Sequence, residues 1–367
     1  MTGFYVILYW FPERLERMTH LLDPVATLLA GRAADHWFLY GFVYTIAVLV
    51  FGLRMLVKHR GNPYQLWRTA SLMAFQLGFA FLLPHLMELA RQPEFYFTYF
   101  WPLKWSYVFP SGVSELRGHP GGLGVFLLVW SAVASLVATP VLTYYFGKRW
   151  YCSWVCGCGG LAETLGDPLR HLSSKSSTAW RIERVSIYAV LGFIVLTTAL
   201  VWTHASGHAP WLGGAGRRLS DWYGFFIGSV FSGVVGVGFY PLLGSRVWCR
   251  FGCPMAAVMG LQQRLWSRFR ITTNGGQCIS CGNCSTYCEM GIDVRAYAQK
   301  GENIVRASCV GCGVCSAVCP RGVLNLENGR THGDRMVGHQ GPWTRLLAEP
   351  PFKSTDAERP QHRKRHS

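Results

Sequence analysis

The hydropathy pattern of the chain alternates between long apolar runs and shorter polar connections. Crossing a lipid bilayer needs about 20 apolar residues. Backbone polar groups find no water inside lipid, so runs of this length must be helices. Each run is bounded by charged residues, Pro or Gly. The pattern therefore predicts a mainly α, polytopic bundle of about five transmembrane helices, at approximately residues 37–56, 69–89, 122–146, 185–203 and 222–244.

Basic residues gather on alternate connections between these runs. Residues 54–68 carry a net charge of +4, and residues 147–184 and 245–273 carry +3 and +5. The connections between them carry net charges between −1 and +1. Positively charged loops stay on the cytoplasmic side of a membrane. Five spans therefore place the N-terminus outside, and the basic loops and the C-terminal part in the cytoplasm.

The polar parts of the chain complete a division into domains. An apolar stretch near the N-terminus is too short to span, so it is expected to lie in the interface or to be re-entrant, with a sixth span as the alternative. A later segment has apolar residues at helical spacing and arginines on its other side, which predicts an amphipathic helix on the inner leaflet. We expect five parts: an N-terminal segment 1–36, a transmembrane domain 37–254, an amphipathic linker helix 255–273, a cysteine-rich domain 274–328, and a basic, disordered tail 329–367.

Composition agrees with a membrane protein. Half of the 367 residues are hydrophobic and only 15% are charged, against roughly 25% in a soluble domain. The net charge of +16 does not indicate a nucleic-acid partner, because most of the excess lies beside the apolar runs. Thirteen cysteines are an odd number, so they cannot all form intrachain disulfides. Their spacing is typical of ligand sets.

Eight of the cysteines form two copies of one pattern. Residues 278–288 read CISCGNCSTYC and residues 309–320 read CVGCGVCSAVCP. Each is C-x2-C-x2-C-x3-C, the pattern of bacterial two-cluster ferredoxins, in which the fourth cysteine of each run binds the other cluster. The spacing predicts a small α+β domain with two [4Fe–4S] clusters, one bound by Cys278, Cys281, Cys284 and Cys319, the other by Cys288, Cys309, Cys312 and Cys315. Glu289 replaces a Pro that many such runs have.

Four more cysteines belong to an internal repeat. RWYCSWVCG (149–157) and RVWCRFGCP (246–254) both place an Arg three residues before a Cys-x3-Cys pair, just after a predicted span. Such a pair puts two thiols on one helical face, so two pairs can converge on one metal. This predicts a site for a third iron–sulfur cluster or for zinc, made of Cys152, Cys156, Cys249 and Cys253. Buried packing of small side chains is the alternative, and Cys158 is a further candidate ligand.

Together these features resemble the membrane polyferredoxins of the NapH and NosR type, which serve periplasmic nitrate and nitrous-oxide reduction. The resemblance covers about residues 122–328 and rests on the spans, the two Cys-x3-Cys motifs and the ferredoxin domain. It implies quinol oxidation, or electron relay between the quinone pool and partner redox proteins, in a bacterial inner membrane. One departure is that Gly157-Cys158-Gly159-Gly160, and not Pro, follows Cys156.

The outer face has candidates of its own. His85 and Glu88 are one turn apart at the end of the second predicted span. Ionisable residues at membrane depth are functional candidates, so this pair could accept protons from quinol; an ordinary polar helix end is the alternative. Histidines on facing helices could instead bind b-type haem. About 30 Å of hydrocarbon would separate this face from the clusters, so we favour a quinone site at the inner face.

We therefore expect a membrane-bound iron–sulfur protein that relays electrons between quinol and partner redox proteins, as a quinol-oxidising component. An accessory metal reductase or an assembly factor for a respiratory metalloenzyme is the alternative. A redox-sensing regulator without turnover is a third possibility. The direction of electron flow depends on hydrogen bonds and solvent exposure around each cluster, which the sequence does not contain.

Overall fold

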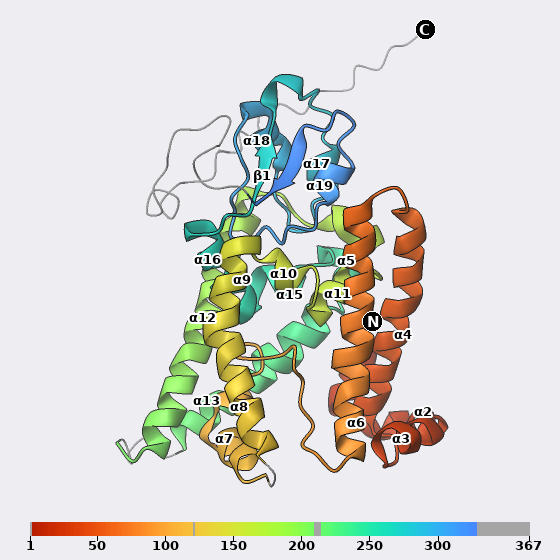
Figure 1. Cartoon of the computed structure of the whole chain (residues 1–367), viewed down its shortest axis with the longest axis vertical. Helices are drawn as coiled ribbons and strands as arrows, with labels where there is room; N and C mark the ends of the chain where they lie inside the picture. The colour runs from red at the N-terminus through yellow and green to blue at the C-terminus, as the bar shows by residue number, and fades with distance from the viewer. Residues whose placement is uncertain (1, 120–121, 209–213, 329–367) are drawn as a thin grey trace.

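The long helices run side by side along one axis, with a small cysteine-rich unit at one end (Figure 1). The computed structural model describes residues 2–119, 122–208 and 214–328. The small unit, residues 270–328, is called the ferredoxin unit below. The molecule is mainly helical with one small sheet, as the sequence predicts.

The described residues contain four helices long and apolar enough to cross a membrane. Two of these helices contain π-helical stretches, and so does the helix at the fifth predicted span. Such stretches often occur at functional sites. The four helices are α4 (His36–Lys58); α5 (Pro63–Ala74) with η2 (Phe75–Leu82) and α6 (Leu83–Leu89); α8 (Leu123–Val133) with η4 (Ala134–Ala138) and α9 (Thr139–Phe146); and α12 (Ser177–Ala205). They correspond to the first four predicted spans.

The fifth predicted span, residues 222–244, differs from the expectation. Its helix begins earlier, as α13 (Ala215–Trp222), and continues as the π-helical η7 (Tyr223–Val235). The chain then turns before the short α14 (Tyr240–Leu243). Polar residues occupy the first turns of this helix, so it is less apolar than the other four and is not among the candidate spans.

The N-terminal segment is made of short helices. These are α1 (Thr2–Trp10), η1 (Pro12–Leu15), α2 (Glu16–Leu21) and α3 (Asp23–Ala30). A helix as short as α1 extends about 14 Å, which is less than half of a bilayer core of about 30 Å. It packs closely on η7, where a Cβ on Gly233 would lie 2.9 Å from the Tyr9 ring. The structure therefore does not support a sixth span made from this segment.

Short helices lie at both ends of the long helices. At the end opposite the ferredoxin unit lie η3 (Trp105–Val108) and α7 (Pro110–Arg117). Beneath the ferredoxin unit lie α10, α11 and α15 (Figure 1). The elements of this junction are α10 (Arg149–Cys152), α11 (Gly157–Glu163), η5 (Asp167–Leu172), α15 (Val247–Phe251) and α16 (Pro254–Leu265).

The linker helix is shorter and more deeply buried than predicted. Helix α16 ends at Leu265, and the last four residues of the expected 255–273 helix form strand β1 (Arg270–Thr273). Eight of its residues are buried, and it contacts α9 and α12. Gly260 allows close packing, because a Cβ there would lie 2.7 Å from the carbonyl oxygen of Ala307. The helix therefore packs inside the protein, whereas we expected it to lie on the leaflet surface.

The ferredoxin unit contains a two-stranded antiparallel sheet and short helices. Strand β1 pairs with β2 (Leu324–Glu327), so that Arg270 faces Glu327 and Thr273 faces Leu324. Each cysteine run leads through a left-handed glycine, Gly282 or Gly313, into a short helix. The helical elements are η8 (Gly275–Gln277), α17 (Asn283–Thr286), α18 (Val294–Lys300) and α19 (Val314–Ala317).

Candidate iron–sulfur sites

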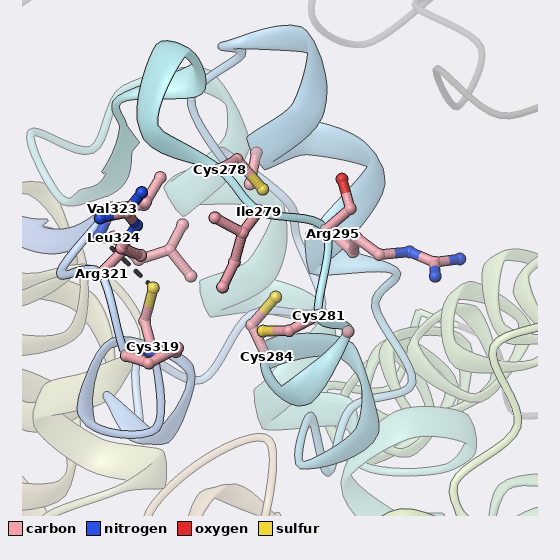
Figure 2. Close-up of a pocket in the computed structure, with 13 residues that line it drawn as sticks. Cys278, Ile279, Cys281, Cys284, Arg295, Cys319, Arg321, Val323 and Leu324 are labelled. Atoms are coloured by element: carbon pink, nitrogen blue, oxygen red, sulfur yellow. Dashed lines mark hydrogen bonds between the residues drawn. The ribbon is translucent and has the colours of Figure 1, made fainter.

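The first predicted ligand set surrounds one pocket of the ferredoxin unit. Its four cysteines line an opening with about 350 Å³ of empty space, part of it open to solvent. Figure 2 shows the sulfurs of Cys278 and Cys281 on the loop that leads into α17, Cys284 on α17 itself, and Cys319 across the pocket. Cys281 is exposed and the neighbouring Ile279 is 55% exposed, so this pocket faces solvent. We call Cys278, Cys281, Cys284 and Cys319 the solvent-facing ferredoxin site.

The second predicted set surrounds a separate pocket on the side of the helices. Its lining is largely apolar, including Ile271, Met290 and Val310, and the space measures about 380 Å³. The structure thus brings together Cys288, Cys309, Cys312 and Cys315, which we call the membrane-facing ferredoxin site. In both pockets, the fourth cysteine of one run lies with the first three of the other. Cluster ligation by these residues remains a prediction.

The two pockets have features that suit [4Fe–4S] clusters. The cysteines are free thiols. Corresponding backbone N–H groups donate to sulfur in each run: Ile292 to Cys288 Sγ and Val323 to Cys319 Sγ, both at 3.4 Å. Burial raises the pKa of Cys284 and of Cys309 to about 11. A buried thiolate is costly without a nearby cation, and bound iron would supply the compensating charge.

The Cys-x3-Cys pairs converge at the junction beneath the ferredoxin unit. All four thiols are buried within one core cluster. Burial raises the pKa of Cys253 well above its usual range, and Cys249, Cys156 and Cys152 raise it further because their charges would be close. Cys249 lies on α15, and Cys253 is the N-cap of α16. We call Cys152, Cys156, Cys249 and Cys253 the Cys-x3-Cys site.

Cys158 lies beside this site but has a different environment. Its side chain forms a hydrogen bond with Cys156, which is the main reason why the pKa of Cys156 is lowered to about 7. On the membrane side, Tyr44 Oη donates to the carbonyl of Gly157 at 2.6 Å, and Gln76 Nε2 donates to that of Val155 at 2.7 Å. A Cβ on Gly157 would lie 2.4 Å from Tyr99 Oη. Polar groups of two long helices and of the 90–104 loop therefore contact the Cys156–Cys158 turn.

A buried group of charges next to these sites was missed by our sequence analysis. Glu163 forms ion pairs with three arginines: Arg68 Nη1 at 2.5 Å, Arg246 Nη2 at 2.7 Å, and Arg170 Nη2. Arg170 Nη1 also donates to Glu289 Oε2 at 2.8 Å. All five side chains are at most 2% exposed. We call Arg68, Arg170, Arg246, Glu163 and Glu289 the arginine–glutamate network.

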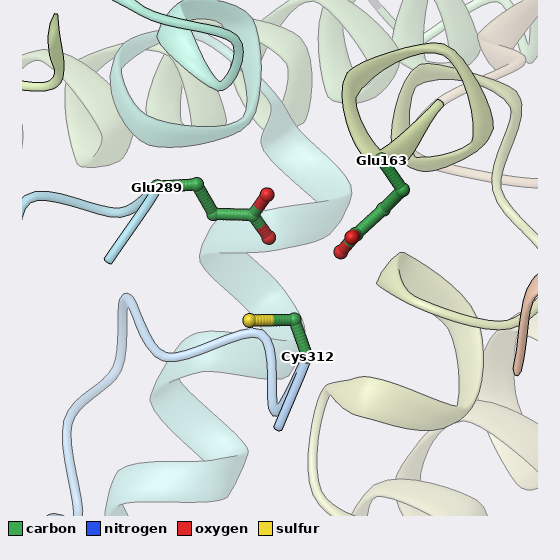
Figure 3. A group of neighbouring side chains, drawn as sticks. All are labelled: Glu163, Glu289 and Cys312. Carbon is green, nitrogen blue, oxygen red and sulfur yellow. The ribbon is translucent and has the colours of Figure 1, made fainter. Parts of the chain in front are cut away.

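The two carboxylates of the network also lie near a cysteine. Ligand atoms of Glu163, Glu289 and Cys312 are within 4.8 Å of one another (Figure 3). Three such groups could bind a cation, but arginines already pair with both carboxylates, and burial together with the neighbouring Glu163 raises the pKa of Glu289. Burial raises the pKa of Glu163, yet Arg170, Arg68 and Arg246 outweigh this effect and hold it well below its usual range. We therefore interpret this group as part of an ion-pair network, not as a separate metal site.

The loop of the membrane-facing ferredoxin site is held by hydrogen bonds from the membrane part. From α5, Tyr64 Oη donates to the carbonyl of Gly311 at 2.7 Å, and Gln65 Nε2 to that of Cys312 at 2.9 Å. Ser153 Oγ, between the first two cysteines of the repeat, donates to the carbonyl of Val310 at 2.7 Å. These contacts join segments more than 150 residues apart, so no local sequence signal indicated them.

His85 and Glu88 lie at the opposite end of the long helices, on α6 (Figure 1). His85 Nδ1 is 3.8 Å from Glu88 Oε2, and Arg32 Nε donates to Glu88 Oε1 at 2.5 Å. The rings of Phe38 and Phe81 lie against the imidazole, with centroids 4.9 and 5.0 Å away. The pair is thus enclosed by aromatic rings and an arginine, far from the cysteine sites, and its proposed role with quinol or haem is untested.

Comparison with known protein families places iron–sulfur domains on all three sites. A 4Fe-4S binding domain matches residues 128–176 and again residues 224–274. These two matches contain the two copies of the Cys-x3-Cys repeat. A 4Fe-4S dicluster domain matches residues 270–320, which contain the eight cysteines of the ferredoxin pattern.

Two curated proteins are similar to this chain. YccM of Escherichia coli, named as a candidate electron transport protein, is 28% identical over 171 residues, which are 45% of this chain and 47% of YccM. The methylamine utilization ferredoxin-type protein MauN of Methylobacillus flagellatus is 27% identical over 173 residues, 44% of this chain and 56% of MauN. The chain thus spans about half the length of the curated relatives it matches. No solved structure is significantly similar to it.

Proposed function

We propose that this chain, a membrane-type polyferredoxin with 4Fe-4S binding domains, relays electrons between the quinone pool and partner redox proteins. The observation that carries the proposal is the order of the three cysteine sites. The Cys-x3-Cys site lies at the junction with the long helices, and the membrane-facing ferredoxin site lies directly beside it. The solvent-facing site, with exposed Cys281, is lined only by residues of the ferredoxin unit.

When bound, a [4Fe–4S] cluster supplies a one-electron carrier at a site of this kind. The chain holds it with thiolates, orients the loops with left-handed glycines, and excludes water. Apolar residues such as Val310 and Met290 line the membrane-facing site and are at most 2% exposed. Exposure of Cys281 leaves one site open to a partner protein. We propose this site as the port for partner redox proteins and the Cys-x3-Cys site as the port for quinol.

A quinol headgroup would approach the Cys-x3-Cys site from the long helices. Tyr44, Gln76 and Tyr99 present polar atoms beside the Cys156–Cys158 turn, within the four-helix region. Gln76 lies in the π-helical stretch of its helix and is 1% exposed. These three residues are our candidates for contacts with quinol, and they lie much closer to the cysteine sites than His85 and Glu88 do.

We also propose that the protein resides in a bacterial inner membrane with the ferredoxin unit in the cytoplasm. The four apolar helices support membrane insertion, and the basic connections support this orientation. A reporter inserted after Ser206 should be active only on the outer side, and one inserted after Asn328 only in the cytoplasm. The reverse pattern would refute the orientation.

The relay is tested by removing one thiol from each Cys-x3-Cys pair. The double variant Cys152→Ala/Cys249→Ala should lose quinol-linked reduction of the ferredoxin sites, while iron in those sites remains. Cys158→Ala, the fifth cysteine of this region, should retain both if it is not a ligand. Reduction from quinol at the normal rate in the double variant would show that these cysteines are structural. Failure of the intact protein to accept electrons from quinol, together with metal-ion reduction, would instead favour the accessory metal reductase.

A further inference from the structure

One residue of the arginine–glutamate network touches both types of cysteine site. Arg246 is the arginine that precedes the second Cys-x3-Cys pair. Its Nη1 donates to the carbonyl of Cys152 at 3.2 Å and lies 3.8 Å from Cys249 Sγ. Its Nη2 binds Glu163 at 2.7 Å and lies 3.0 Å from Glu289 Oε1, without the angle of a hydrogen bond. The guanidinium therefore connects the Cys-x3-Cys site with the ferredoxin unit.

The other end of the network reaches the membrane-facing ferredoxin site. Glu289 directly follows Cys288, and both carboxylates lie within 4.8 Å of the Cys312 thiol. Arg68 is one turn after Gln65 on α5, whose amide donates to the carbonyl of Cys312. Apart from its ion pair with Glu163, the Arg68 guanidinium has no hydrogen-bond partner among the described residues. Its positive charge therefore stays only partly compensated beside this site.

The charges of the network do not cancel. Three guanidinium groups face two carboxylates, which leaves one positive charge. The network is buried, so water screens this charge weakly. At its edge, Asp167 accepts from Arg170 Nε at 2.8 Å and also pairs with Lys58 at 2.5 Å, so Asp167 and Lys58 together leave the sum unchanged. A cluster held by four thiolates becomes more negative when it accepts an electron, and a nearby positive charge stabilises that state.

We propose that the arginine–glutamate network raises the reduction potential of the membrane-facing ferredoxin site. Glu289 lines the membrane-facing pocket, whereas no residue of the network lines the solvent-facing pocket, so the network acts mainly on one ferredoxin cluster. Glu289, at the position where many such cysteine runs have Pro, contributes one of the two carboxylates of this network. The inference rests on the proposed function, because it requires that the sites hold clusters.

A series of charge variants tests this inference. Arg68→Gln lowers the net charge of the network from +1 to 0, and Glu163→Gln raises it to +2. The double variant Arg68→Gln/Glu163→Gln restores +1, and Arg68→Lys keeps it. The midpoint potentials of both ferredoxin clusters are measured in the purified full chain by dithionite titration with electron paramagnetic resonance detection. Arg54→Gln, which removes an exposed arginine of α4, is the matched control.

The expected order of potentials at the membrane-facing site is Glu163→Gln highest, Arg68→Gln lowest, and the parent, Arg68→Lys and double variant between them. Each step should shift the reduction equilibrium about tenfold, which is about 59 mV for one electron. The solvent-facing cluster should not shift. If Arg68→Gln fails to accumulate, Glu163→Gln tests the same point with opposite sign. Potentials that do not follow the charge, or equal shifts at both clusters, overturn the inference, whereas a parent protein without clusters overturns the proposed function itself.

Discussion

Removal of the Glu289 carboxylate should weaken the attachment of the ferredoxin unit to the membrane part. In Glu289→Ala, Arg170 Nη1 loses a partner at 2.8 Å and Arg246 Nη2 loses one at 3.0 Å. Breaking a buried ion pair by removing one partner costs about 3–5 kcal/mol, because the remaining charge stays buried without compensation. Both arginines keep Glu163 as a partner. We therefore expect a cost near the lower end, about 3 kcal/mol.

Amide hydrogen exchange of residues 306–313 measures this cost, because this segment of the ferredoxin unit contacts the membrane part. Local opening sets the exchange rate of such amides. At about 1.4 kcal/mol per tenfold change, a cost of about 3 kcal/mol accelerates exchange about a hundredfold. Glu302→Ala, a change of the same type on the same unit but outside the network, should alter exchange less than threefold. Acceleration below tenfold in Glu289→Ala, or equal in both variants, would refute the idea that the network holds the two parts together.

Three further outcomes follow from the structure. Anaerobically purified protein should contain about eight irons per chain in the ferredoxin unit, and Cys281→Ser should lower the iron content by damaging one cluster while the signal of the other persists; zinc in place of iron would contradict the assignment. Gly159→Ala should disrupt the Cys-x3-Cys site, because its Cβ would lie 2.2 Å from the carbonyl oxygen of Cys152; Gly78→Ala, where no atom lies within 4 Å, is the control, and equal yields of folded protein from both would contradict the packing. Tyr64→Phe, which removes the hydrogen bond to Gly311, should lower stability by about 1 kcal/mol in thermal unfolding, and an unchanged midpoint would show that this contact contributes nothing.

The hydropathy pattern and the spacing of the cysteines together predicted much of the architecture. Apolar runs of bilayer length are local features, and four of them are indeed long apolar helices. The eight-cysteine pattern is also local, and it was sufficient to group the cysteines into the two sets that line the two pockets. The Cys-x3-Cys repeat was visible for the same reason, and its two copies coincide with two matches to a 4Fe-4S binding domain.

Errors arose where neighbouring elements decide the structure. The fifth run was placed by apolarity alone, but the helix begins at Ala215 with polar residues and ends at Val235. The spacing of residues 255–270 predicted a helix on the membrane surface. Packing against α9 and α12 buries α16, and pairing with β2 turns its end into a strand. Periodicity shows that a helix has an apolar face but not what covers that face.

The charge network is what only the tertiary structure decided. In the sequence, Arg246 was only the basic residue before a Cys-x3-Cys pair, and Glu289 was only a departure from the Pro that many such cysteine runs have. Arg246 and Glu163 are 83 positions apart, and Arg170 and Glu289 are 119 apart. An ion pair over such a separation depends on how α11, η5 and α15 pack beneath the ferredoxin unit. Residue spacing identifies groups that share a helix or a loop, whereas burial of opposite charges from distant segments depends on the folded chain as a whole.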